Sequence, residues 1–363
     1  MDLFLAAAIG AAAAAYLIVR YRALHLAVTG DRPGGGLPQK VHDEATPRIG
    51  GLAVVCGLLA AGVAGTLSGI VTAPFLWLMV AALVPAFLGG FAEDLTRRVG
   101  AAPRLLMTLV SAAIAFVWLD ANLYRSDIAW LDAAFSRWPL SLAGTLLAVA
   151  GLAHAMNIVD GYHGLAAGVG VLALLGLAVV AQHVGDLQLA SVGFAAAGAY
   201  AGFLLLNWPL GRIFLGDGGA YLLGTTLAIL SAQLVGRHTD VSPWFPLVLV
   251  VYPVWETLFS ILRRATLHRS PIGAPDARHL HSLFYRHVMA RLFPGADARS
   301  ARRRNAGTSL PFWAMQGAMV ALGVAHYDAT PFLVAQAYGF LGVYCVLYFL
   351  AARLAPRAAV SGA

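Results

Sequence analysis

The stretch LAAGVGVLALLGLAVVA, residues 165–181, contains no charged or hydrogen-bonding side chain. A helix needs about 20 mainly apolar residues to cross the roughly 30 Å hydrocarbon core of a bilayer, so this stretch is typical of a membrane span. Similar stretches recur along the chain and predict an all-α, polytopic membrane helix bundle of about eleven transmembrane helices. The predicted spans lie near residues 2–19, 49–69, 74–92, 104–119, 140–156, 165–181, 189–206, 218–235, 244–262, 309–325 and 331–352.

The composition of the whole chain indicates the same class of protein. Hydrophobic residues make up 60% and charged residues 11% of the 363 positions, and the mean hydropathy is +0.76. These values lie outside the range of soluble globular domains. No soluble domain, internal repeat or low-complexity tract is evident, so residues 1–363 are expected to form a single integral membrane domain.

Basic residues predict the orientation of the chain. Cytoplasmic loops of membrane proteins are enriched in lysine and arginine. With the amino terminus outside, all 24 lysines and arginines except Arg125, Arg137 and Arg237 fall inside. This predicts a periplasmic amino terminus and a cytoplasmic carboxy terminus. The arginine-rich segment 263–308 is then a large cytoplasmic basic loop, which suits an anionic substrate and anionic membrane lipid; no nucleic-acid partner is indicated.

Acidic residues on the same face are the strongest candidates for chemistry. Glu93 and Asp94 stand side by side at the end of a span, and paired carboxylates usually share a cation or a proton. Asn157 and Asp160 are three residues apart, so on a helix they face the same way. Asp217 lies between glycines, where exposed backbone amides suit a phosphate or metal–phosphate site. Two plainer interpretations stay open, in which Asp160 or Asp217 only caps a helix.

A divalent metal with a polyphosphate is the simplest ligand for several acids and many arginines at one membrane face. Mg²⁺ prefers oxygen ligands and keeps substrate phosphates in its shell, so one or two of Asp94, Asp160 and Asp217 would suffice. A zinc site is not indicated, because His279 and His281 lack a third clustered soft ligand.

Two further segments carry polar candidates. The glycines and prolines of the first inner loop disfavour a helix and leave Lys40, His42 and Arg48 exposed at the membrane surface, although an ordinary positive-inside loop would look the same. Glu256 lies inside the predicted span 244–262. An ionisable residue there is functional by default, and the alternative is a buried hydrogen-bonding residue that orders the bundle.

Together these motifs resemble the polyprenyl-phosphate N-acetylhexosamine-1-phosphate transferases. The resemblance runs from about Asp31 to His281. It is carried by Lys40 with His42, PRIGG (47–51), Glu93-Asp94, NIVDGYHGLAAG (157–168), NWPLGRIFLGDGGAYLLG (207–224), Pro253 with Glu256, and PDARHLHSL (275–283).

The resemblance implies a reaction and a location. A bacterial inner-membrane enzyme with a cytoplasmic active site would move N-acetylhexosamine 1-phosphate from a UDP-N-acetylhexosamine to polyprenyl (undecaprenyl) phosphate and release UMP. Direct attack and a covalent enzyme intermediate both stay open, and so does a homodimer.

The resemblance also implies roles for individual residues. Asp217 and Asp160 would hold Mg²⁺, or Mn²⁺ in its place, on the diphosphate, and Asp94 would bind or deprotonate the lipid phosphate. The implied catalytic residues are Glu93, Asp94, Asp160, Asp217 and His281. The implied substrate-binding residues are Lys40, His42, Arg104, Asn157, Asn207, Arg278 and His279.

Three positions depart from the family pattern. Glu93 stands where an Asp is usual, His163 where many members have an Asp, and Ser282 where another His is common. His163 cannot replace a carboxylate as a ligand for a hard metal. The departures favour a branch that initiates cell-surface polysaccharide or O-antigen synthesis over the peptidoglycan branch.

Two interpretations from other classes remain. A secondary transporter of an anionic solute would explain Glu256 and glycine-broken helices, but it should show internal repeats and polar residues near the bilayer midplane. A noncatalytic scaffold would use the arginine-rich loop to bind a partner, but it leaves Asp94, Asp160 and Asp217 without a task.

Overall fold

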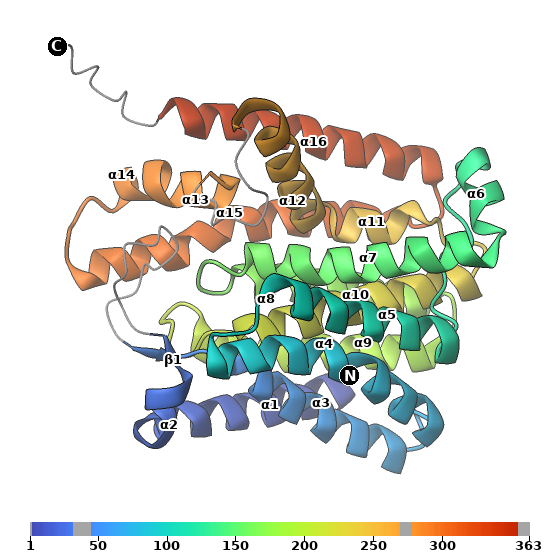
Figure 1. Ribbon diagram of the computed structural model, residues 1–363, viewed down its shortest axis with the longest axis horizontal. Helices are drawn as coiled ribbons and strands as arrows, with labels where there is room; N and C mark the ends of the chain where they lie inside the picture. The colour runs from blue at the N-terminus through green and yellow to red at the C-terminus, as the bar shows by residue number, and fades with distance from the viewer. Residues whose placement is uncertain (1, 32–44, 269–277, 355–363) are drawn as a thin grey trace.

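The computed structural model describes residues 2–31, 45–268 and 278–354 (Figure 1). Within these ranges the regular structure consists of helices and one small hairpin, which confirms the predicted all-α class. The long helices are α1 (Asp2–Arg20), α3 (Gly50–Leu67), α4 (Ala73–Thr96), α5 (Ala101–Trp118), α7 (Trp138–Val159), α8 (Leu165–His183), α9 (Leu187–Asn207), α10 (Gly216–Arg237), α15 (Ala298–Ala325) and α16 (Thr330–Arg353). The shorter helices are α2 (Arg22–Thr29), α6 (Ala129–Phe135), α11 (Trp244–Leu249), α12 (Val251–Arg263), α13 (Leu280–Leu283) and α14 (Ala290–Leu292), with π-helical turns η1 (Arg264–His268) and η2 (Phe284–Met289).

The predicted polytopic membrane architecture is confirmed in its main features. Among the residues that the structure describes, nine helices are long and apolar enough to cross a membrane. They are α1, α3, α4, α5, α7, α8, α9, α10 and α16, and each coincides with a predicted span. The orientation of the termini stays a prediction.

The two remaining predicted spans differ from the expectation. Segment 244–262 is two helices, α11 and α12, which meet at Val250. Pro253 lacks the N–H that would bond the carbonyl of Leu249 in a continuous helix. Gln316 on α15 donates to that carbonyl instead, at 2.6 Å. Helix α15 starts at Ala298, so it includes the last part of segment 263–308 as well as the predicted span 309–325.

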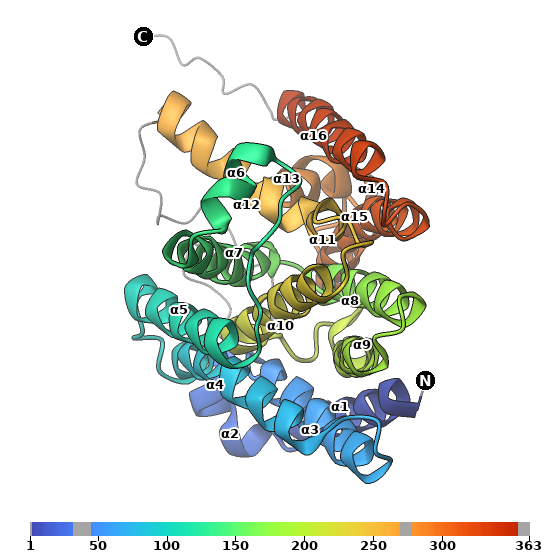
Figure 2. The same ribbon diagram turned by 90° about the vertical axis from the view of Figure 1, so that its right-hand side faces the viewer.

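Helix α10 lies at the centre of the bundle (Figure 2). It packs against α3, α4, α7 and α8. In α10, 89% of the apolar span is buried within the protein, against 22% in α5, although α10 has the lowest mean hydropathy of the nine, 1.4. A helix that is surrounded by other helices need not present apolar side chains to lipid. Burial among helices therefore lets α10 be the least apolar of the nine.

Close backbone contact fixes the start of α10 against two neighbouring helices. A Cβ atom on Gly90 of α4 would lie 2.4 Å from the Gly218 nitrogen, and a Cβ on Gly51 of α3 would lie 2.5 Å from the Gly219 nitrogen. Any larger side chain at Gly90 or Gly51 would separate the helices. Glycine at these positions brings the end of α4 within hydrogen-bonding distance of the first turn of α10.

A small hairpin positions the segment before α3. Strands β1 (Gly30–Asp31) and β2 (Thr46–Pro47) pair antiparallel. The Phe214 N–H then donates to the Pro47 carbonyl at 2.8 Å, and the Gly50 N–H donates to the Phe214 carbonyl at 2.9 Å. These bonds hold residues 47–50 beside the loop that precedes α10.

Candidate active site

Asp94, on the last turns of α4, caps α10 from outside the helix. Its side chain is 1% exposed. Oδ1 accepts a hydrogen bond from the Asp217 N–H and Oδ2 accepts one from the Gly218 N–H, both at 2.9 Å. The first N–H groups of a helix have no partner within it, and the helix dipole favours a negative charge there. Asp94 therefore holds the start of α10 in place, and its predicted role on the lipid phosphate stays a prediction.

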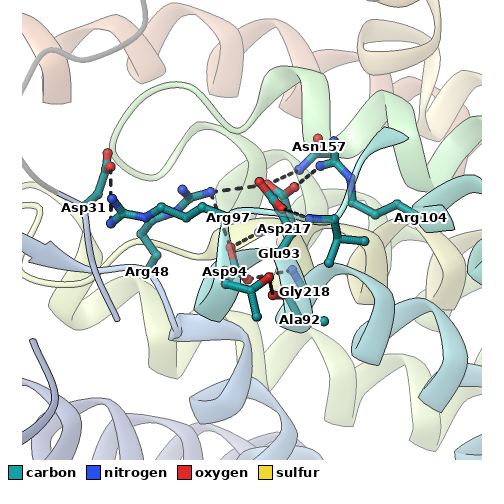
Figure 3. A network of polar contacts seen from close by, with 12 residues as sticks. Asp31, Arg48, Ala92, Glu93, Asp94, Arg97, Arg104, Asn157, Asp217 and Gly218 are labelled. Carbon is teal, nitrogen blue, oxygen red and sulfur yellow. Dashed lines mark hydrogen bonds and ion pairs between the residues drawn. The ribbon is translucent and has the colours of Figure 1, made fainter. Parts of the chain in front are cut away.

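Asp217, in the first turn of α10, lies between three groups from other elements (Figure 3). Arg104 on α5 donates to its Oδ2 through Nη1. Asn157 on α7 donates to its Oδ1 at 3.0 Å, and Nη2 of Arg48 lies 3.7 Å from the same oxygen. The N-cap position of α10 is Leu215, so the interpretation that Asp217 only caps its helix is wrong.

Arg48 links the two carboxylates. Its Nη2 lies 3.4 Å from Oδ1 of Asp94 and 3.7 Å from Oδ1 of Asp217, and its side chain is 22% exposed. The sequence predicted an exposed basic residue at the membrane surface, and the structure corrects this, because the backbone bonds of residues 47–50 turn Arg48 toward the site. The PRIGG motif was the available signal, since Gly50 and Gly51 permit the close approach.

Asp160 follows the end of α7 and carries a carboxylate with no hydrogen bond or ion pair to the described parts of the chain. Desolvation by burial, and then the Asp217 carboxylate, raise the pKa of Asp160 to about 7, while Arg48 acts in the opposite direction. The N-cap position of α8 is Gly164, with φ +75°. Asp160 is therefore not the cap of α8, which was the plainer interpretation.

Asn207 joins the loop around Asp160 to the loop before α10. Its Oδ1 accepts from the Gly164 N–H at 2.6 Å, and its Nδ2 donates to the Ile213 carbonyl at 2.7 Å. Both ends of the amide are thus engaged inside the protein, which gives Asn207 a positioning role; substrate binding by Asn207 stays a prediction. His163 is also held here, with Nδ1 at 3.3 Å from the Pro209 carbonyl oxygen.

Glu256 on α12 organises a second cluster. Its Oε1 lies 3.1 Å from Nδ1 of His279 and accepts hydrogen bonds at 2.9 Å from the Leu280 N–H and from the Tyr344 hydroxyl. From its sequence position, Glu256 has either a functional role or an ordering role. The structure shows that Glu256 anchors residues 279–281, the histidine segment, to α12 and α16.

His281 connects this cluster to the loop around Asp160. Its Nδ1 lies 3.2 Å from the Tyr252 hydroxyl and 3.6 Å from Oε2 of Glu256. A Cβ atom on Gly161 would lie 3.9 Å from its Nε2, and its ring is 5.6 Å from that of Tyr162. The histidine segment thus lies against the loop that follows Asp160, as a shared site requires.

The other predicted site residues are spread around this centre. Oε2 of Glu93 accepts from the Val99 N–H at 2.8 Å, so Glu93 faces the loop after α4 while Asp94 faces α10. Arg278 is exposed directly before His279. Lys40 and His42 lie outside the described residues.

The arrangement of the carboxylates decides which of them suit a divalent metal. Within residues 2–31, 45–268 and 278–354, no three His, Cys, Asp or Glu side chains are grouped so that they could hold a metal ion. Mg²⁺ requires only one or two carboxylates when substrate phosphates complete its shell. Asp160, without a described partner, and the neighbouring Asp217 fit that donor set. Asp94 fits less well, because both of its oxygens are held by backbone amides of α10, whereas the partners of Asp217 are side chains.

Fold and site together define a polytopic membrane protein with a carboxylate–arginine cluster at one end of its bundle. Residues 76–235 match the model of glycosyl transferase family 4. The chain is 33% identical over 249 residues to a probable undecaprenyl-phosphate N-acetylglucosaminyl 1-phosphate transferase of Bacillus subtilis, covering 67% of this chain and 66% of that protein. The chain belongs to glycosyl transferase family 4, which confirms the resemblance seen in its motifs.

Two other relatives carry names of the same kind. A decaprenyl-phosphate N-acetylglucosaminephosphotransferase of Mycolicibacterium smegmatis is 30% identical, over 66% of this chain and 65% of that protein. An undecaprenyl-phosphate alpha-N-acetylglucosaminyl 1-phosphate transferase of Escherichia coli K12 is 27% identical, over 68% and 67%. The chain spans about two thirds of the length of these relatives, and just under two thirds of the first two.

Proposed function

We propose that this protein transfers N-acetylhexosamine 1-phosphate from a UDP-sugar to polyprenyl phosphate, forming polyprenyl-diphospho-sugar and UMP. The observation that carries the proposal is the position of Asp217, held by Arg48, Arg104 and Asn157 from three other elements. Such a cluster supplies carboxylates that can bind a metal–diphosphate complex and arginines that can neutralise phosphate charge. The relatives' names supply the reaction class.

In the proposed reaction an oxygen of the lipid phosphate attacks the phosphorus that carries the sugar. The bond from that phosphorus to the bridging oxygen breaks, and its electron pair leaves with UMP. A phosphate monoester is largely ionised near pH 7, so the attack needs position and charge more than a general base. Arg48 and Arg104 would oppose the negative charge of the phosphates, and His279, His281 and Arg278 would contact the diphosphate or the sugar.

The proposed reaction includes a divalent metal ion, Mg²⁺ or Mn²⁺. Asp217 and Asp160 would hold the ion, which would neutralise charge on the leaving UMP. Without an ion, Asp160 has no described cation bonded to it, whereas Asp217 has two arginines. This arrangement suits an ion that enters with the nucleotide and reduces the repulsion between Asp160 and Asp217.

The finer features of the function follow from the same proposal. N-acetylglucosamine appears in each relative's printed name and is the sugar to test first. A cytoplasmic active site in the inner membrane fits the distribution of basic residues, and initiation of cell-surface polysaccharide or O-antigen synthesis fits the motif departures. A transporter is not favoured, because the relatives are named as transferases.

The test is exchange of labelled UMP into UDP-N-acetylglucosamine by membranes that contain the protein. Exchange is expected to require Mg²⁺ and polyprenyl phosphate, and to fall at least about 100-fold in Asp217→Asn. Asp240→Asn, at an exposed acid beyond the far end of α10, is the matched control and should keep wild-type exchange. Full exchange in Asp217→Asn would refute the role of Asp217. Exchange without polyprenyl phosphate would instead indicate a covalent enzyme intermediate.

A further inference from the structure

A pocket of about 510 Å³ lies apart from the carboxylate cluster, between the start of α15 and the turn after α9. Trp208, Leu210, Phe293 and Leu310 form its apolar walls. Three arginines on the first turns of α15 also line it: Arg299, Arg302 and Arg303. A pocket that combines a long apolar wall with a triple positive charge suits an amphiphile with an anionic head.

The three arginines are arranged for an external anion. Their spacing puts them on one face of α15, and all three are exposed. In the described part of the chain no carboxylate forms an ion pair with any of them; the nearest acid in sequence is Asp297, at the N-cap position. Positive charge near a helix N-terminus is disfavoured by the helix dipole. An anion bound at this face would relieve that repulsion.

The predicted span 309–325 within α15 would put this face at the level of lipid head groups. Its 28 residues extend for about 42 Å at 1.5 Å per residue, which exceeds a hydrocarbon core of roughly 30 Å. The predicted span begins at Ser309, so the first turns project beyond the core. The arginines would then face head groups, while Leu310, 49% exposed, would face the acyl region.

We propose that this pocket binds an anionic glycerophospholipid of the surrounding leaflet, with its phosphate on Arg299, Arg302 and Arg303 and an acyl chain along Leu310 and Trp208. Basic pockets at the ends of membrane helices are suited to such head groups. The proposal stands without the transferase activity, because its site shares no residue with the carboxylate cluster.

The same part of α15 holds the loop around Asp160. The Trp208 indole N–H donates to the Ala306 carbonyl at 3.0 Å. Asn305 accepts from the His163 N–H at 2.7 Å, and Ser309 donates to the His163 carbonyl at 2.6 Å. A lipid in the pocket would therefore stiffen a helix that contacts the active-site loop directly.

Native mass spectrometry of the purified protein tests the proposal, with phosphatidylglycerol and phosphatidylcholine added at equal concentration. Wild type is expected to retain phosphatidylglycerol preferentially. Each of Arg302→Gln and Arg303→Gln should weaken that retention about fivefold, as expected for one basic residue near a lipid surface. Leu310→Trp should weaken it by filling the pocket without changing charge. Arg353→Gln, which removes an exposed arginine at the end of α16, is the matched control and should change nothing.

Each other outcome overturns the proposal. Equal retention of the two lipids, or equal losses in Arg302→Gln and Arg353→Gln, would show only a diffuse surface charge. Normal retention in Leu310→Trp would exclude the pocket. A parallel arm with polyprenyl phosphate separates the two lipid phosphates: if only polyprenyl phosphate is lost from the arginine variants, the pocket belongs to the acceptor substrate.

Discussion

Replacing Asp94 with asparagine separates a positioning role from a role in proton transfer. Asparagine keeps the size of the side chain, but one oxygen becomes an NH₂ group that cannot accept from the N–H of Asp217 or Gly218. An unpaired buried N–H costs about 1–3 kcal/mol, and loss of the charge at the helix N-terminus adds about 0.3–1 kcal/mol. The free energy of unfolding should therefore fall by roughly 1–4 kcal/mol.

Asp94→Asn should also lower activity, because it lets Asp217 move out of position. When one of the two hydrogen bonds to residue 94 is lost, the first turn of α10 can shift, and a displacement of about 1 Å in an active site can cost about 100-fold in rate. UMP exchange should drop by that factor, while the shape of its pH dependence should stay that of wild type. Thermal unfolding in detergent, followed with the exchange assay across pH 5–9, measures both effects.

Three outcomes decide between the roles of Asp94. Lower stability, slower exchange and an unchanged pH profile support positioning. Wild-type stability with wild-type exchange would refute the reasoning from the two hydrogen bonds. Wild-type stability with lost exchange and an altered pH profile would favour direct action on the lipid phosphate. Asp240→Asn again serves as the control for removal of one negative charge.

Two further predictions follow from the packing of the site. Gly90→Ala puts a methyl group 2.4 Å from the Gly218 nitrogen and should lower the unfolding free energy by about 1–3 kcal/mol. The control is Gly151→Ala, which has no atom within 4 Å of the new methyl and should be neutral or slightly stabilising in the same thermal assay. Equal effects of the two variants would contradict the close-contact explanation. Glu256→Gln should keep the fold but slow UMP exchange about fivefold, because a weaker acceptor facing His279 costs about 1 kcal/mol; unchanged exchange would remove Glu256 from the site.

The composition and hydropathy of the chain were enough for its architecture. A helix in lipid must form all of its backbone hydrogen bonds internally and present apolar side chains over about 20 residues. Each span can therefore be recognised from its local sequence. The break at Val250 was not visible in this way. A proline in a membrane helix is tolerated when another element takes the free carbonyl, and here that element is Gln316, over 60 residues downstream.

The candidate site was read from the sequence as a set of residue types on one face. Asp94, Asp160 and Asp217 were found because acids are rare in such a chain and stood near glycines at the ends of spans. The resemblance assigned a role to each of them, and those roles stay predictions. The plainer alternative for Asp217 was a helix cap, but the first N–H groups of α10 are capped by Asp94 on another helix. That contact depends on where α4 packs against α10.

Sequence alone therefore determined the membrane class, most of the spans and the chemical character of one face, because these properties depend on local composition. Tertiary structure alone decided that Arg48 joins two carboxylates, that Glu256 anchors the histidine segment, and that three arginines of α15 line a separate pocket. Each of these is a contact between residues far apart in the chain. Such contacts depend on how closely helices approach, which a linear pattern does not specify.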